Sequence, residues 1–574
     1  MGKFFLGVLV GVVVAVLCGI VVAFAIARLT ASKAPQVDAE SVLVLNLEGD
    51  VPEIAPVEIP IPFLQAQGAP TVRDVWTSLH AAASDSRIKA VMLEPRGLGI
   101  GWAKMQEIHQ DILDFKKSGK PVYAFLQGAG TREYYLASAA DKIYVSSDDS
   151  VDVKGLGLEA LYLKNGLDKL GINVQVDHIG RYKDAGDMFT RTDMSPETKE
   201  VLNQVLDQLY GDFCATVGAG RRKSADDIRA IVDKGPFMGS QAKTNGLVDE
   251  LGYRDQAYGD LNKKVGVADL KKVSIKTYFR AEPGSGDRIA FIAAEGDIVQ
   301  GDPGDQFGDN QIIASERIAK TIRQVRNDST VKGVIVRVDS PGGDAVASDD
   351  ILHELKMLSD SKPTVISMSD YAASGGYFIS MTGSKIVAYP DTLTGSIGVL
   401  YIRPNLHDLY GKLGINAAIL TRGKFADIDS DYVPLSDAAK QKLHESIQLT
   451  YQSFVSKVAT ARHKTYDQID PIAQGHVWMG AQARQNGLVD DLGGLDDAVT
   501  LIRQQAKLPS SGSTDLVMYP GRRSLLEILM SSSPDDVAAG LADSRIRKVL
   551  RGLPTPTLLR GGVLRILPYQ ISVQ

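Results

Sequence analysis

The stretch SDYAASGGYFI, residues 369–379, is the part of the sequence around which the rest is organised. It follows the largely apolar run 364–368, which predicts a short buried strand that ends in small residues, with Ser374 at the turn and a helix opening at Gly375. A hydroxyl at a helix N-terminus lies beside unpaired backbone N–H groups and the positive end of the helix dipole, and both stabilise an oxyanion. Ser374 is therefore a candidate nucleophile, and the alternative is an ordinary N-cap serine.

Composition limits the classes of protein to which the chain can belong. Its 574 residues are 44% hydrophobic with a formal net charge of -6, which indicates a globular chain with at least two domains. The sequence has no long block of lysine and arginine, so we expect no nucleic-acid partner. Two cysteines, and eight histidines without ligand spacing, predict no disulfide framework, no metal site and no cofactor.

The amino-terminal segment predicts a membrane anchor. Phe4 to Ala27 is a run of 24 residues without a charge, between Lys3 and Arg28. As a helix, this run is long enough to cross a hydrocarbon core of roughly 30 Å. A cleaved signal peptide is the alternative, although its apolar region is only about 7–15 residues long. We expect an anchor over residues 1–29 and a linker over residues 30–40, with the N-terminus inside and the bulk of the chain outside.

The two halves of the chain repeat one another. Similar segments occur at 41–50 and 288–297, at 169–173 and 412–416, and at 245–249 and 486–490. A repeat of about 240 residues is too long for a solenoid unit and indicates two copies of one domain. Apolar strands alternate with helical patterns within each copy, which predicts an α/β fold.

Composition also predicts the boundaries of the two copies. Residues 281–287 are rich in glycine and polar residues and separate a first repeat at 41–280 from a second repeat at 288–507. Residues 508–574 form a C-terminal extension. This extension either packs on the second repeat or binds a partner or another subunit, and the sequence leaves both interpretations open.

The repeat supplies an internal control for the candidate nucleophile. At an offset of 243 residues, Ser374 aligns with Thr131, and the two glycines after Ser374 align with Arg132 and Glu133. The glycine turn at 339–344 likewise aligns with residues that lack its Ser-Pro-Gly-Gly pattern. Such a turn aims backbone N–H groups at a substrate oxygen, because glycine adopts the required conformations and presents no side chain. Only the second copy keeps both features.

A serine nucleophile needs a base. His353 and His407 flank the site in the sequence, but neither has the sequence context of a catalytic triad. Lys183 in the first copy aligns with Ala426 in the second, again at an offset of 243. The two copies are thus complementary, since one keeps the serine and the glycine turns and the other keeps the lysine.

Several short motifs together resemble a known family. They are SPGG at 340–343, YAASGGY at 371–377, TGSIG at 394–398 and GRYK at 180–183. The combination is similar to the long, membrane-anchored bacterial form of the signal peptide peptidase A family, also called protease IV, over roughly residues 41 to 503. The resemblance implies two ClpP/crotonase-like domains and a serine endopeptidase that degrades cleaved signal peptides and other hydrophobic peptides at the bacterial inner membrane.

The resemblance also implies a role for each candidate residue. Ser374 is expected to be the nucleophile, Lys183 the general base of a Ser-Lys dyad, and Ser396 the hydroxyl that orients the lysine. Gly375, with Gly342 or Gly343, is expected to supply the oxyanion N–H groups. For Ser396 the alternative is a structural turn before a strand.

The candidate nucleophile occurs only in the second copy and the candidate base only in the first. The site is therefore predicted to form only where a first copy meets a second. We expect a homo-oligomer such as a tetramer-like closed ring, and the competing arrangement is a monomer with its halves face to face. A crotonase-like acyl-CoA enzyme and a catalytically inactive membrane scaffold remain the alternatives in function. The sequence does not decide the cleavage preference, the number of subunits or whether the dyad forms within one chain.

Overall fold

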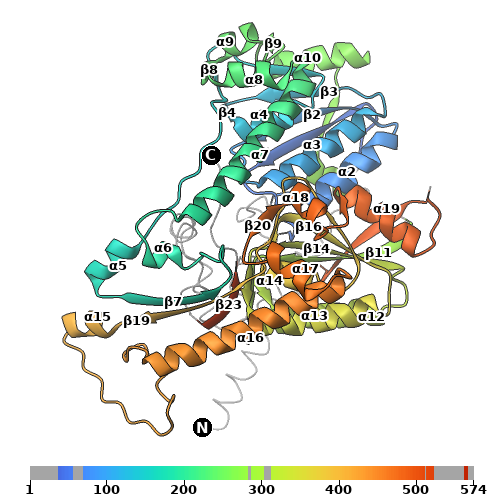
Figure 1. The fold of residues 1–574 in the computed structure, drawn as a ribbon. Helices are drawn as coiled ribbons and strands as arrows, with labels where there is room; N and C mark the ends of the chain where they lie inside the picture. Colours follow the sequence, from blue (N-terminus) through green and yellow to red (C-terminus); the bar gives the residue numbers. More distant parts are fainter. Residues whose placement is uncertain are drawn as a thin grey trace, which may run out of the picture.

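The computed structural model describes residues 37–55, 69–281, 286–302, 312–510, 512–521 and 562–566 (Figure 1). The predicted anchor, most of the predicted linker and most of the C-terminal extension lie outside these ranges. Within the described ranges, no helix combines the length and the apolar character needed to cross a membrane.

The first repeat is built on a six-stranded sheet with the order β10-β1-β2-β3-β5-β9. All five pairings are parallel. Parallel sheets are covered on both faces, which explains why, of these six strands, the inner ones are largely apolar. Their bounds are Lys271–Ser274 for β10, Ser41–Glu48 for β1, Ile88–Arg96 for β2, Val122–Leu126 for β3, Lys142–Val145 for β5 and Glu250–Leu251 for β9.

The second repeat has the same sheet. The order β22-β11-β14-β16-β17-β21 matches that of the first repeat strand for strand, and its pairings are also parallel. The bounds are Thr514–Tyr519 for β22, Asp287–Glu295 for β11, Gly333–Ser340 for β14, Thr364–Ala373 for β16, Lys385–Ala388 for β17 and Asp491–Leu492 for β21. β22 takes the place of β10, so the sheet of the second repeat includes residues beyond 507. The α/β prediction is confirmed.

Helices cover both sheets, and most of them also correspond between the repeats. Those of the first repeat are α2 (Val72–Ser84), α3 (Trp102–Lys116), α4 (Thr131–Ala137), α5 (Lys164–Leu170), α6 (Asp187–Thr190), α7 (Pro196–Arg221), α8 (Ala225–Val232), α9 (Gly239–Thr244), α10 (Arg254–Val265) and α11 (Ile275–Ala281). Those of the second are α12 (Ser315–Asn327), α13 (Ala345–Ser359), α14 (Gly375–Ile379), α15 (His407–Lys412), α16 (Asp437–Ala461), α17 (Tyr466–Ile469), α18 (Gly480–Asn486) and α19 (Leu495–Gln505). The long helices α7 and α16 begin alike, because the Ser195 and Ser436 hydroxyls accept from backbone N–H groups of their first turns.

Small strands lie beside the ends of the main sheets. In the first repeat they form a sheet of their own, and in the second they extend β16. They are β4 (Ala129–Gly130), β6 (Ser150–Asp152) and β8 (Phe237–Met238) in the first repeat, and β18 (Leu393–Gly395) and β20 (Val477–Met479) in the second.

A further sheet joins the two repeats. Its order is β13-β12-β15-β23-β19-β7, and β7 is the strand that comes from the first repeat. β7 pairs antiparallel with β19 along seven residues, from Val399 opposite Ile179 to Asn405 opposite Asn173, and the two strands lie side by side in Figure 1. The bounds are Ile312–Ala314 for β13, Asp297–Val299 for β12, Gly342–Asp344 for β15, Gly562–Ile566 for β23, Val399–Asn405 for β19 and Asn173–Ile179 for β7.

Buried charges fill the contact between the repeats. Lys104 on α3 has its Nζ 2.7 Å from the Asp339 carboxylate, 3.8 Å from that of Glu295 and 3.9 Å from that of Asp370. Burial raises the pKa of Glu295 and of Asp370 to about 7, although the Lys104 ammonium opposes this rise. One ammonium does not balance three buried carboxylates, so this contact retains protons near neutral pH. Asp339 and Asp370 lie on β14 and β16, which both lead into the candidate site.

Candidate active site

Ser374 lies at a sharp turn between β16 and α14, as the sequence predicted. Its φ is 52° and its ψ is -111°, a backbone conformation that a residue with a side chain adopts only under strain. The turn is fixed on both sides, because the Ser374 N–H donates to Gly395 O (2.8 Å) and the Phe378 N–H donates to Ser374 O (2.8 Å). Gly376 is required here, since a Cβ at that position would lie 2.5 Å from Ser340 O.

Lys183, Ser374 and Ser396 meet in the structure. Lys183 Nζ lies 2.8 Å from Ser374 Oγ, 2.9 Å from Ser396 Oγ and 3.0 Å from Ser396 O. All three side chains are completely buried. The lysine of the first repeat therefore reaches the serines of the second within a single chain.

The sheet shared by the two repeats brings these residues together. Lys183 follows the end of β7 at Ile179, and Ser396 comes shortly before the start of β19 at Val399. Because β7 and β19 pair from Ile179 opposite Val399 onwards, the two chain segments lie at the same end of the sheet. Ser396 has a φ of 50°, so both serines that contact Lys183 have strained backbone conformations.

Two glycines that the sequence analysis did not single out pack against Lys183. A Cβ at Gly475 would lie 2.6–2.8 Å from the N, Cα and Cβ of Lys183, and a Cβ at Gly398 would lie 3.0 Å from its Cδ. Backbone hydrogen bonds hold Gly475 beside the lysine, from Gly475 N–H to Ile397 O (2.8 Å) and from Tyr182 N–H to Gln474 O (2.8 Å). Gly398 ends the TGSIG motif at 394–398, but that motif indicates no role for this glycine, and Gly475 lies in no motif and is one of many isolated loop glycines.

Substitution of Gly475 by alanine is expected to displace Lys183 and to lower kcat for peptide hydrolysis by about 10- to 100-fold, with KM nearly unchanged. Gly487→Ala is the matched control. Both glycines have a φ of 75°, but a Cβ at Gly487 would approach only the end of the flexible Lys464 side chain. Steady-state kinetics of both variants checks this prediction. Equal losses of kcat in the two variants would mean that the strain of the backbone, and not the position of Lys183, is responsible.

The glycine turn after β14 lies next to Ser374. Ser340 Oγ donates to Gly296 O (2.7 Å) and accepts from the Gly342 N–H (3.1 Å), so the hydroxyl fixes the start of the turn. Gly342 and Gly343 have φ values of 110° and 151°, and a Cβ at Gly343 would lie 2.1 Å from Ile298 O. The Gly342 N–H is engaged by Ser340, and Gly343 pairs with Ile298 of β12. Both glycines therefore stay candidates for the oxyanion site, together with Gly375 at the first position of α14.

In the first repeat a carboxylate occupies the corresponding turn. Glu133, which aligns with Gly376, accepts from the Leu98 N–H (2.5 Å) and from the Gly130 N–H (2.9 Å). Leu98 lies in the segment that aligns with the Ser-Pro-Gly-Gly turn, and Gly130 directly precedes Thr131. The backbone donors of this copy are thus satisfied internally, which is consistent with the predicted loss of its site.

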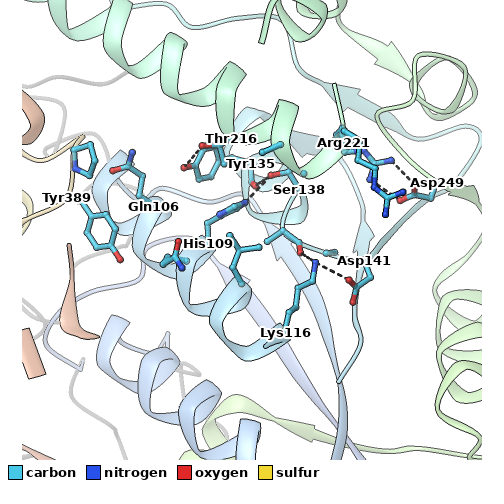
Figure 2. Close-up of a pocket in the computed structure, with 18 residues that line it drawn as sticks. Gln106, His109, Lys116, Tyr135, Ser138, Asp141, Thr216, Arg221, Asp249 and Tyr389 are labelled. Carbon is cyan, nitrogen blue, oxygen red and sulfur yellow. Dashed lines mark hydrogen bonds and ion pairs between the residues drawn. The ribbon is translucent and has the colours of Figure 1, made fainter. Parts of the chain in front are cut away.

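A cavity lies elsewhere, between α3, α4 and α7 of the first repeat (Figure 2). It has a volume of about 800 Å³ and contains a serine–histidine pair, with His109 Nε2 3.2 Å from Ser138 Oγ. The Ser138 hydroxyl donates its proton to Tyr135 O (2.6 Å), so it does not offer that proton to the histidine. Burial lowers the pKa of His109 to about 4. In the described part of the chain, no group of three or more histidine, cysteine or acidic residues is placed to hold a metal ion.

The sequence was compared with known proteins. The model of "Peptidase family S49" matches residues 114–268 and 356–509, once in each repeat. The chain belongs to peptidase family S49. It is therefore a serine peptidase, and the predicted family membership and serine peptidase activity are confirmed.

Proteases from distant organisms are similar to this chain over most of its length. The "Serine protease SPPA, chloroplastic" of Arabidopsis thaliana is 34% identical over 91% of this chain and 77% of its own length. "Protease 4" of Salmonella typhi is 35% identical over 82% of this chain and 77% of its own, and "Protease 4" of Haemophilus influenzae is 33% identical over 75% and 72%. The similarity to these S49 peptidases thus extends over both repeats.

Proposed function

We propose that this S49 peptidase is an endopeptidase with a Ser-Lys dyad, in which residues 41–280 supply the base Lys183 and residues 288–507 supply the nucleophile Ser374. The observation that carries the proposal is the separation of 2.8 Å between Lys183 Nζ and Ser374 Oγ. This is the distance over which a base takes a proton from a hydroxyl.

The chemistry follows from the burial of the lysine. Burial disfavours the ammonium form of a lysine, and Lys183 is completely buried. A neutral Lys183 amine takes the proton of Ser374 as the serine oxygen attacks the peptide carbonyl, and then delivers it to the nitrogen of the leaving amine. Water hydrolyses the acyl-enzyme in a second step, with Lys183 again as the base.

The remaining predicted residues have supporting roles in this proposal. Ser396 places its hydroxyl and its carbonyl oxygen 2.9 and 3.0 Å from Lys183 Nζ, which fixes the amine in front of Ser374. The N–H group of Gly375, with that of Gly342 or Gly343, stabilises the tetrahedral oxyanion. Glycine at these positions lets the substrate backbone approach closely.

The proposed location and substrate of the enzyme are argued from its sequence. The uncharged segment Phe4 to Ala27 anchors the enzyme in the bacterial inner membrane by a single span, with the catalytic bulk on the outer side, where released signal peptides and other hydrophobic peptides collect. The site forms where a first repeat meets a second, and repetition of such a contact between chains closes a homo-oligomeric ring. Such a ring admits unfolded peptides and excludes folded proteins.

A fluorophosphonate probe tests the proposed nucleophile in the full-length, detergent-solubilised enzyme. We expect one adduct, located at Ser374 by mass spectrometry, and no labelling of Ser374→Ala. Thr131→Ala is the matched control, because Thr131 is the counterpart of Ser374 in the first repeat, and it is expected to label like the unmodified enzyme. A crotonase-like enzyme or an inactive scaffold would leave Ser374 unlabelled. An adduct on another serine, such as Ser138, would show that the active site lies there and not at Ser374.

A further inference from the structure

The buried lysine Lys104 connects the first repeat to the strands that carry the candidate site. It lies on α3 and is 3% exposed, and its Nζ is 2.7 Å from the Asp339 carboxylate of β14. Burial lowers the pKa of this lysine, but the facing carboxylates, that of Asp339 first and then those of Glu295 and Asp370, outweigh burial and hold the pKa well above its usual value. Lys104 therefore stays protonated and is a fixed cation, not a base.

Asp339 links this cation to the turn that holds two of the oxyanion candidates. Its Oδ2 contacts Lys104, its Oδ1 accepts from the Tyr371 N–H of β16 (3.0 Å), and its carbonyl oxygen accepts from the Gly296 N–H after β11 (2.9 Å). The next residue is Ser340, whose hydroxyl fixes the start of the glycine turn. Asp339 thus joins the ends of three neighbouring strands directly before that turn.

A second carboxylate connects the strand of the nucleophile to the same helix. Asp370, four residues before Ser374, accepts from the Gly101 N–H (3.0 Å) and from the Lys104 N–H (2.9 Å) at the start of α3. α3 has no side-chain cap from its own N-cap residue, so this carboxylate satisfies two of its free N–H groups. A Cβ at Gly101 would lie 2.2–2.5 Å from the Asp370 carboxyl group, so glycine is needed for this close approach.

The duplication shows that this cluster of charges is confined to the contact that carries the candidate site. At the offset of 243 residues, the positions that align with Lys104, Asp339 and Asp370 carry side chains of a different kind, namely Ala347, Arg96 and Gln127. Ala347 is completely buried on α13, the counterpart of α3. The repeated fold therefore forms without these three groups, and they occur together where α3 meets the strands of the nucleophile.

We propose that Lys104 is a positioning residue for peptide hydrolysis, which through Asp339 and Asp370 holds the glycine turn and the strand of the nucleophile in the arrangement that receives the oxyanion. This inference rests on the proposed function, because it takes Ser374 as the nucleophile and the glycine turn as part of the oxyanion site. Such a site needs its N–H groups placed to within about 0.5 Å. Loss of the lysine charge relaxes the turn and weakens binding of the transition state, although no group that contacts the substrate is removed.

Lys104→Met in the full-length, detergent-solubilised enzyme is expected to lower kcat for a fluorogenic hydrophobic peptide by about 10- to 100-fold, with KM nearly unchanged. Lys116→Met is the matched control. Lys116 lies on the same helix and pairs with Asp141 of its own repeat at 2.9 Å, and its loss is expected to leave kcat unchanged. An unchanged kcat in Lys104→Met, or a loss of kcat/KM that comes from KM, would overturn the proposal.

Two inhibitors distinguish displaced oxyanion donors from a merely loosened fold. A peptide aldehyde forms a bond from its carbonyl carbon to the serine oxygen and places its own oxygen in the oxyanion site, whereas the corresponding peptide amide binds without reaction. Lys104→Met is expected to raise Ki of the aldehyde at least about 10-fold and to leave Ki of the amide unchanged. Equal changes in both would overturn the proposal. An aldehyde that binds the unmodified enzyme no better than the amide does would contradict Ser374 as the nucleophile, and this inference with it.

A double-mutant cycle tests whether Lys104 acts through Asp339. Asp339→Asn keeps an acceptor for the Tyr371 N–H but removes the charge, and it is expected to lower kcat about 10-fold. Adding it to Lys104→Met is expected to cause no further loss, because both changes break one contact. Losses that multiply would show that the two residues act independently and would overturn the proposal. If Lys104→Met does not fold, an unchanged kcat and aldehyde Ki in Asp339→Asn would overturn it.

Discussion

Replacement of Lys183 by methionine is expected to lower kcat for peptide hydrolysis by about 10³-fold at neutral pH, while the enzyme stays folded. Methionine nearly fills the space of the lysine and suits a completely buried position, so the loss reports the missing amine and not a cavity. The 2.8 Å contact between Nζ and Ser374 Oγ disappears. Steady-state kinetics, with thermal unfolding followed in parallel, measures the effect.

Two further measurements distinguish a base from a merely structural residue. Lys183→Arg is expected to be as inactive as Lys183→Met, because a guanidinium stays protonated and accepts no proton. Residual labelling of Lys183→Met by the fluorophosphonate is expected to rise steeply with pH, since hydroxide then replaces the missing base. The control Lys154→Met removes an exposed lysine that pairs with Asp152 and keeps full activity. Appreciable turnover by either Lys183 variant would remove Lys183 from the dyad.

The sequence predicted the parts of the site that the duplication makes visible. Lys183 lacks a counterpart because position 426 is alanine, and Ser374 lacks one because position 131 is threonine. Subtraction of one offset was enough to select both residues, which the structure brings to 2.8 Å from each other. The strand, turn and helix around Ser374 also followed from local pattern, because small residues and glycines at such a turn leave few alternatives.

Other parts of the site depend on contacts between distant segments and left no comparable signal. Gly475 is one glycine among 55, and only its distance to Lys183 distinguishes it. Glu133 was recognised as the replacement of a glycine, but its two backbone hydrogen bonds are visible only in the fold. The position of β23 could not be predicted either, because the hydrophobic pattern of a five-residue strand does not specify that it pairs with β15 and β19. The pairing of β7 with β19 had to be known before the two residues could be placed together within one chain.

Removal of the Arg337 guanidinium is expected to destabilise the contact between the repeats more than any surface substitution. Arg337 is 1% exposed and binds two carboxylates of the first repeat, Glu53 at 2.9 Å and Glu107. It also donates to the Ser367 and Ser369 hydroxyls on β16. Arg337→Met leaves both carboxylates buried without the guanidinium that pairs with them, at a cost of about 3–5 kcal/mol. For repeats of this size the apparent Tm is expected to fall by roughly 6–20 °C.

The stability that Arg337→Met loses is expected to increase with pH, a direction that other causes of instability do not share. Burial already raises the pKa of Glu107, and the Arg337 guanidinium opposes that rise. Without Arg337, the folded-state pKa of Glu107 lies further above that of the unfolded chain, so the folded state loses stability as pH rises. Arg337→Met is therefore expected to lose more of its apparent Tm at pH 8 than at pH 5, as measured by differential scanning calorimetry.

A surface ion pair serves as the control for this prediction, and a compensating variant tests whether the unpaired carboxylates cause the loss. Arg323→Met breaks the pair with Glu354, in which the arginine side chain is 56% exposed, and is expected to cost less than about 1 kcal/mol. Addition of Glu53→Gln and Glu107→Gln to Arg337→Met removes the unpaired charges and is expected to recover most of the lost stability. If Arg337→Met melts like Arg323→Met, the buried charges do not hold the repeats together. Because β14 and β16 carry the glycine turn and Ser374, a loosened contact would also separate the nucleophile from the lysine of the other repeat.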